Sequence, residues 1–154
     1  MKHLATLRYL LLVLLFATAS ACGDDEGKQA DPAPTSHSVA IHYIGAGLNN
    51  LGARIAAGII PPSGPSQSLL NIDPIPGAQV DVTTAASTVP TSSDFSVTVD
   101  FTTVKGTAKA PAGAYLKAEI IVDGKVRKTV QIDSTTPAGA AYVTGNATIL
   151  SKEW

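Results

Sequence analysis

Apolar and polar residues alternate along several short stretches of this chain, a pattern typical of half-buried β-strands. The clearest stretch covers residues 94–101. Its apolar face carries Phe95, Val97, Val99 and Phe101. Its other face, which we expect to meet water, carries Ser96, Thr98 and Asp100. The same alternation over residues 38–44 places Val39, Ile41 and Tyr43 on one face.

Three further strands are predicted from weaker patterns, over residues 68–72, 78–83 and 141–150. Gly145 and Asn146 interrupt the last of them, and this pair predicts a bulge or a turn there. Val and Thr, which favour strands, are abundant throughout.

Residues 114–133 read as a β-hairpin with a turn at Asp123 and Gly124. A two-residue loop would set Ile120 against Arg127, so apolar residues would face polar ones along the hairpin. A three-residue loop of residues 122–124 with Gly124 left-handed aligns the apolar sets instead. It also pairs Glu119 with Arg127. We therefore predict the three-residue loop, because a one-residue slip would turn every side chain to the other face.

The segment from Gly45 to Gly77 is rich in Gly and Pro, yet carries many Leu and Ile residues. The spacing of Leu48, Leu51, Ile55 and Ile59 fits one face of a short helix over residues 48–57. Two short strands, one of them residues 53–60, fit equally well. The segment either wraps the domain and buries its own apolar residues, which we favour, or forms a loop for a ligand or partner.

Short strands separated by turns, without alternating helices, predict an all-β fold: an antiparallel Ig-like β-sandwich over residues 38–154.

The N-terminus has the pattern of a signal peptide over residues 1–21. Lys2 and Arg8 precede an apolar run from Tyr9 to Phe16, and small residues follow. A run of eight is short of the ~20 apolar residues that span a bilayer.

The single cysteine follows directly, in the sequence Ala-Ser-Ala-Cys at residues 19–22. This sequence resembles the lipobox of bacterial lipoproteins, although Ala19 stands where Leu is usual. The resemblance implies cleavage before Cys22 and lipidation of Cys22. Asp24, Asp25 and Glu26 then resemble the acidic signal that sends Bacteroidota-type lipoproteins to the outer face of the outer membrane. A periplasm-facing anchor is the alternative.

Residues 22–37 are predicted to form a lipidated, disordered tether, because residues 23–37 contain no large apolar residue. The charge of the chain is divided accordingly. Without residues 1–21, 9 Lys and Arg remain against 12 Asp and Glu, whereas residues 38–154 hold 8 of each. No basic block exceeds the Lys-Val-Arg-Lys of residues 125–128, so we expect no nucleic-acid partner.

The sequence offers little for catalysis, and we expect no enzymatic activity, no cofactor and no metal site. The glycines at residues 45 and 47 lack the third glycine of a dinucleotide fingerprint, because residue 50 is Asn. His42 is the only histidine inside the predicted sandwich, and no Gly-x-Ser-x-Gly elbow occurs. Six aspartates have no calcium-loop spacing, and we interpret them as solvated residues. They are Asp73, Asp81, Asp94, Asp100, Asp123 and Asp133.

Residues 114–148 are also similar to MmpS-like domains, the Ig-like parts of small membrane-tethered proteins. The similarity lies in residues 120–126, Ile-Ile-Val-Asp-Gly-Lys-Val, and in Ala141-Tyr142-Val143. The Leu-Pro-Trp motif and the C-terminal cysteines of that family are missing.

These patterns together predict a lipid-anchored cell-envelope protein that acts as a non-enzymatic interaction or structural module. Its partners would be membrane lipid, through the acyl chains, and an envelope protein or glycan. The alternative is a small-ligand or glycan-binding accessory lipoprotein of an envelope transport system, with residues 45–77 at the rim of its pocket. A hydrolase that uses His42 or a carboxylate pair is a third hypothesis.

Overall fold

A computed structural model describes residues 33–154, which contain nine β-strands and one short 3₁₀ helix. The strands are β1 (Ser36–Ala46), β2 (Ala53–Ile60), β3 (Gln67–Ile72), β4 (Gln79–Thr83), β5 (Ser87–Pro90), β6 (Asp94–Phe101), β7 (Tyr115–Val122), β8 (Lys125–Asp133) and β9 (Val143–Ile149). The 3₁₀ helix, η1 (Ser151–Glu153), follows β9. Within this part of the chain, no helix has the length and apolar character needed to cross a bilayer.

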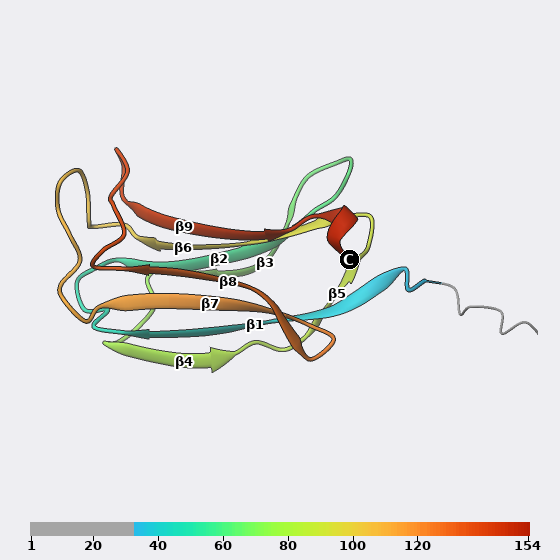
Figure 1. Ribbon diagram of the computed structural model, residues 1–154, viewed down its shortest axis with the longest axis horizontal. Coiled ribbons are helices and arrows are strands. Elements are labelled where there is room, and N and C mark those ends of the chain that lie inside the picture. Colours follow the sequence, from blue (N-terminus) through green and yellow to red (C-terminus); the bar gives the residue numbers. More distant parts are fainter. Residues whose placement is uncertain (1–32) are drawn as a thin grey trace, which may run out of the picture. The chain divides into compact units, whose positions relative to one another are not determined.

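The strands form two antiparallel sheets that pack face to face (Figure 1). One sheet has the order β4-β1-β7-β8, with β5 paired to the start of β1, and the other has the order β3-β2-β6-β9. The predicted all-β sandwich is therefore confirmed. β1 begins at Ser36, two residues before the predicted start of the domain, and β5 lies in a stretch for which no strand was predicted.

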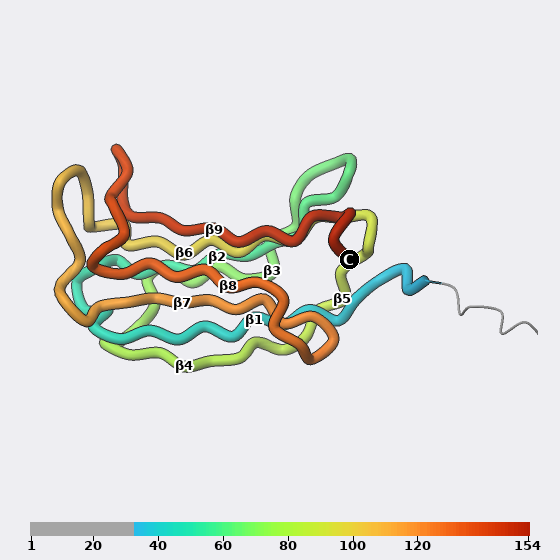
Figure 2. The backbone as a smooth tube through the Cα atoms, in the orientation of Figure 1, coloured from blue at the N-terminus to red at the C-terminus, as the bar shows by residue number. Residues whose placement is uncertain are grey.

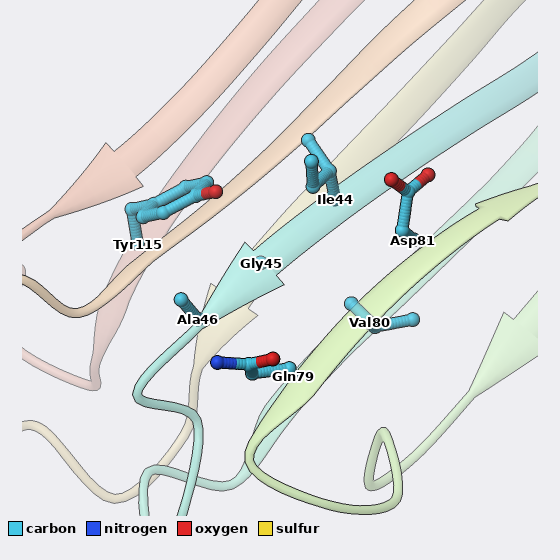
Figure 3. A pocket seen from close by; sticks show the side chains of 7 residues that line it. All are labelled: Ile44, Gly45, Ala46, Gln79, Val80, Asp81 and Tyr115. Atoms are coloured by element: carbon cyan, nitrogen blue, oxygen red, sulfur yellow. The ribbon is translucent and has the colours of Figure 1, made fainter.

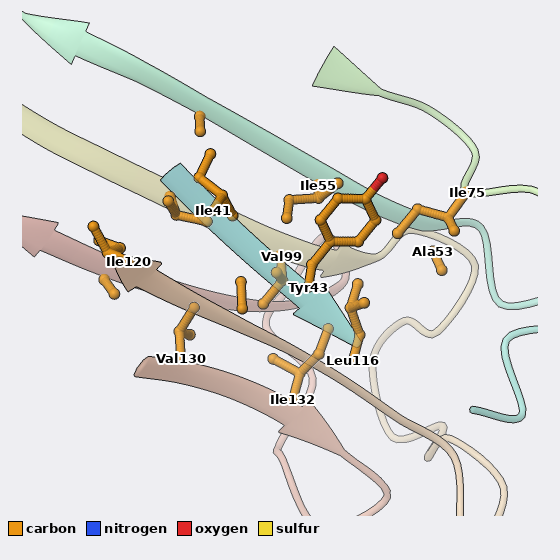
Figure 4. Close-up of a cluster of buried hydrophobic side chains, with 14 of the residues drawn as sticks. Ile41, Tyr43, Ala53, Ile55, Ile75, Val99, Leu116, Ile120, Val130 and Ile132 are labelled. Carbon is orange, nitrogen blue, oxygen red and sulfur yellow. The ribbon is translucent and has the colours of Figure 1, made fainter. Parts of the chain in front are cut away.

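The core lies between the sheets and is built from the inward residues of the alternating stretches (Figure 4). Val39, Ile41 and Tyr43 of β1 are buried as predicted. The four apolar residues of β6 are also at most 1% exposed. One prediction for β6 is wrong: Asp100 does not face water but is completely buried. It lies on the outer face of its sheet, where Arg54 of β2 pairs with it.

The segment of residues 45–77 forms strands and not a helix. Asn50 and Gly52 have φ of 61° and 57°, which turns the chain before β2 begins. Along β2 the buried residues then recur with a period of two, because Ala53, Ile55 and Ala57 face the core. Leu48, Leu51, Ile59 and Ile75 are buried as well. The interpretation that this segment buries its own apolar residues is confirmed for these positions, whereas Leu69, Leu70 and Ile72 are half-buried and Ile60 is 43% exposed.

The predicted three-residue loop of the β7–β8 hairpin is wrong. Asp123 and Gly124 have φ of 49° and 78°, and they form a two-residue loop that pairs Val122 with Lys125. Positive φ at both positions is typical of the type I′ turn, whose twist matches that of the strands.

A β-bulge in β8 corrects the register that the two-residue loop would impose. Ile121 pairs with Val126 and Ile120 with Lys128, so Arg127 is the extra residue. Beyond the bulge, apolar residues pair with apolar residues: Ala118 with Val130, and Leu116 with Ile132. The bulge thus brings apolar residues opposite one another, as we had expected of the loop, but in a register shifted by two residues: the three-residue loop would have paired Leu116 with Val130. As a result, Glu119 pairs with Thr129 and not with Arg127.

The predicted interruption at Gly145 is also absent from the described structure, because β9 pairs with β6 without a shift from Val143 to Ile149. Gly145 faces the core instead. A Cβ atom there would lie 2.8 Å from Val130 and 2.9 Å from Ile132. The glycine therefore lets β9 approach β8 closely, and it does not bend the strand.

The first and last described strands bring the two ends of this unit together. The start of β1 and η1 lie at the same end of the sandwich, as the tube in Figure 2 shows. The ring of His37 stacks on that of Trp154, with centroids 5.3 Å apart. The indole N–H of Trp154 also donates to the carbonyl oxygen of Ser93 at 2.7 Å.

Candidate functional site

The residues predicted to direct export and lipidation lie outside the described part of the chain. They are Cys22, Asp24, Asp25 and Glu26. His37, which we had assigned to the tether, lies in β1, where its Nδ1 is 2.6 Å from a carboxylate oxygen of Asp123.

Four titratable side chains form a continuous chain of contacts across the outer face of β4, β1 and β7. The Lys117 ammonium lies 2.7 Å from Glu119. The second Glu119 oxygen lies 2.9 Å from Nδ1 of His42, and Nε2 of His42 lies 2.9 Å from Asp81. We call these four residues the polar chain. Strand register explains the arrangement, because His42 pairs with Glu119 while Asp81 pairs with Ile44, the next outward residue of β1.

The polar chain shifts the ionisation of its central members. Hydrogen bonds to Glu119 and then Asp81 raise the pKa of His42 above 6.5. Hydrogen bonds from Lys117 and then His42 lower the pKa of Glu119 below 4.5. Because carboxylates only accept hydrogen bonds, both ring nitrogens of a protonated His42 donate. With His42 charged, the polar chain holds two positive and two negative groups.

A shallow hollow of about 430 Å³ lies beside the polar chain, toward the end of β1 (Figure 3). The side chains that line it are Ile44 and Ala46 of β1, Gln79, Val80 and Asp81 of β4, and Tyr115 of β7. Tyr115 stands on one side and the β4 residues on the other, with the two β1 residues between them. We call this the sheet-face hollow. It combines an apolar middle and one aromatic ring with polar groups at its edge.

A second hollow, of about 490 Å³, lies among the loops that precede β2 and β4. It is lined by residues 48–50, 52–53 and 74–77, together with Thr103. Parts of the segment predicted to form a pocket rim therefore border both hollows. This second hollow has no aromatic side chain or charged group among its lining residues.

Among the described residues, the hydrogen-bond partners of the His42 ring are two carboxylates. The hydrolase hypothesis required a carboxylate or hydroxyl group near this residue, and two carboxylates are close. Both ring nitrogens are thereby committed to carboxylates, and within residues 33–154 neither is hydrogen-bonded to a hydroxyl group. A general base that activates Ser or Thr needs such a bond.

Arg54 and Asp100 form a second polar cluster on the other sheet. Nε and Nη2 of Arg54 donate to one oxygen of Asp100 at 2.8 and 2.6 Å. Arg54 also lies over the ring of Tyr142, and Asp73 is 3.9 Å away. The other oxygen of Asp100 has no hydrogen-bond partner among the described residues. No group of three or more His, Cys, Asp or Glu side chains in residues 33–154 is arranged to hold a metal ion.

Sequence reasoning missed the polar chain, although part of its signal was present. The alternation of residues 38–44 already placed His42 on the outer face, and the hairpin placed Glu119 there. The missing information was that β7 and β4 lie on either side of β1.

No protein-family profile matches this chain, and no curated protein matches it either. The similarity to lipoproteins and to MmpS-like domains therefore stays a prediction from the residues.

Proposed function

We propose that this protein is a lipid-anchored β-sandwich of the bacterial cell envelope, and that it acts as a non-enzymatic interaction or structural module on the outer membrane. The observation that carries the proposal is the lipobox-like sequence ending at Cys22, followed by Asp24, Asp25 and Glu26. The commitment of His42 to two carboxylates supports a non-enzymatic role.

The length of chain before the sandwich is compatible with this anchoring. Ser36, the first residue of β1, is 14 residues after Cys22. Even fully extended, that length reaches at most about 50 Å. A lipidated Cys22 would therefore hold the sandwich close to the membrane surface.

Labelled palmitate tests the anchor. We expect the label on the wild-type protein and none on Cys22→Ala, since Cys22 is the chain's single cysteine. We also expect the protein that still carries residues 1–21 to accumulate in cells treated with globomycin. A wild-type protein that carries no label and fractionates with the soluble proteins would contradict the proposal.

Protease access on intact Bacteroidota cells tests the proposed surface location. Replacing Asp24, Asp25 and Glu26 together by Ala should keep the label but protect the protein from added protease. Asp31→Ala is the matched control, because it removes an acidic residue of the same segment outside the triplet. Equal protease access for all three proteins would contradict a role for the triplet in export.

A second candidate function is binding of a small ligand or glycan beside an envelope transporter. The sheet-face hollow favours it, because an aromatic ring and polar groups converge there on one open face. Small-molecule sites combine concave apolar surface with a few placed polar groups in this way.

A further inference from the structure

The sheet-face hollow has an apolar side and a polar side. Tyr115 presents a half-buried ring from β7, and Ile44 and Ala46 lie between it and β4. Gln79 and Asp81 are exposed on the opposite side. The small side chain of Ala46 leaves the space in front of the Tyr115 ring open, since the two residues are direct cross-strand partners.

The charges next to the hollow are already paired. Oδ1 of Asp81 bonds to His42, and Lys117 is held by Glu119. An anionic ligand would find no unpaired cation among the lining residues, and a cationic ligand would compete with His42 for Asp81. A neutral polar ligand needs no unpaired cation and does not compete with His42 for Asp81. The second oxygen of Asp81 and the amide of Gln79 can still hydrogen-bond to it.

We propose that the sheet-face hollow binds one neutral pyranose unit of a glycan, with Tyr115 beneath the sugar ring and with Gln79 and Asp81 at its hydroxyl groups. This inference rests on the second candidate function above and names its ligand class and site.

A pyranose ring matches both sides of the hollow. One face of the ring presents C–H groups, which carry partial positive charge and pack against the negative face of an aromatic ring. Its hydroxyl groups lie around the edge and both donate and accept hydrogen bonds. The Asp81 carboxylate accepts such bonds, and the Gln79 amide donates and accepts them. His42 is a positioning residue, because it holds the carboxylate of Asp81 through its Nε2 atom.

Saturation-transfer NMR on the full chain in detergent micelles tests the proposal. The probes are the methyl pyranosides of glucose, galactose, mannose and N-acetylglucosamine at millimolar concentration, and a trisaccharide of each. We expect transfer to the ring C–H protons of at least one probe. We expect Tyr115→Ala to weaken its binding about tenfold and Tyr115→Phe to retain it. Equal affinity for a methyl pyranoside and its trisaccharide indicates a site for one sugar unit. Binding of the trisaccharide without binding of the single unit would contradict a one-unit site.

Tyr142→Ala is the matched control, because Tyr142 lies beside Arg54 on the other sheet and does not line the hollow. Should Tyr115→Ala not fold, the exposed residues carry the test, and Gln79→Ala and Asp81→Ala should each weaken binding. Binding that survives all of these changes would place the sugar elsewhere, leaving the glycan-binding function intact and this site wrong. Absence of binding to every probe would contradict both, whereas lipid anchoring is decided separately by the palmitate label.

Discussion

Asp100 shows how one residue can depend on a partner distant in sequence. Its side chain is fully buried on the outer face of β6, and the guanidinium of Arg54 binds a single one of its oxygens. Removing one member of a buried ion pair leaves a charge without its partner, which costs far more than the pair contributes.

We therefore predict that Arg54→Met lowers the free energy of unfolding by about 3 kcal/mol. The double variant Arg54→Met with Asp100→Leu should lose less, because no unpaired charge stays buried. Arg127→Met is the control, and this exposed change should cost below about 1 kcal/mol. Chemical denaturation followed by circular dichroism measures all three. A double variant that loses as much free energy of unfolding as Arg54→Met, or more, would contradict the argument.

The alternation of residues 94–101 correctly placed the four apolar side chains of β6, but it could not place Asp100. A period of two assigns a residue to a face, and it does not say whether that face is covered. Arg54 covers Asp100. It lies 46 residues earlier in the sequence, in a segment that fitted a short helix and two strands equally well. Gly145 is a similar case, because its role depends on the side chains of β8.

At the scale of elements, the two strands of the β7–β8 hairpin were predicted correctly, but its turn was not. Apolar matching required an odd residue somewhere between β7 and β8, and the sequence did not say where. The structure places that residue at Arg127, inside the strand, and keeps the loop at Asp123 and Gly124. The polar chain could not be predicted for a related reason. The alternation within one strand does not show which strands lie beside it in the sheet.

The polar chain connects β4, β1 and β7, and it should make stability depend on pH. The raised pKa of His42 means that its contribution is complete below pH 6.5 and is lost as pH rises through the folded pKa. The lowered pKa of Glu119 means that its contribution is present above pH 4.5 and is lost as pH falls through the folded pKa. The polar chain therefore contributes most to the free energy of unfolding between pH 4.5 and pH 6.5.

We predict that the wild-type free energy of unfolding declines above pH 6.5 relative to His42→Gln, by up to about 1 kcal/mol for partly exposed groups. The decline on the acid side should persist in the variant, because the lowered pKa values of Asp123, Asp133 and Glu153 also contribute there. Urea unfolding across a pH series gives both curves. A difference between them that does not change with pH would argue against the ion pairs.

At the scale of the whole unit, the two ends of β1 have different surroundings. Ser36 lies beside the C-terminus, while Ala46 borders the sheet-face hollow. A strand of 11 residues separates them by about 33 Å. Under the proposed anchoring, the hollow would therefore lie one strand length away from Ser36, where the sandwich connects to the lipidated N-terminus. Its face would be open to a glycan or protein partner.

The contact between His37 and Trp154 joins the first described strand to the last residue of the chain, so we expect the end of the chain to unfold together with the sandwich. Trp154 is the single tryptophan, so tryptophan fluorescence reports the surroundings of this residue. The fluorescence and circular dichroism transitions in denaturant should coincide. Trp154→Ala should lower the free energy of unfolding by about 1–2 kcal/mol, through the lost stacking and the lost bond to Ser93. Trp154→Phe should lose less, because a ring remains over His37. A fluorescence transition at lower denaturant than the circular dichroism transition would show that this end opens by itself.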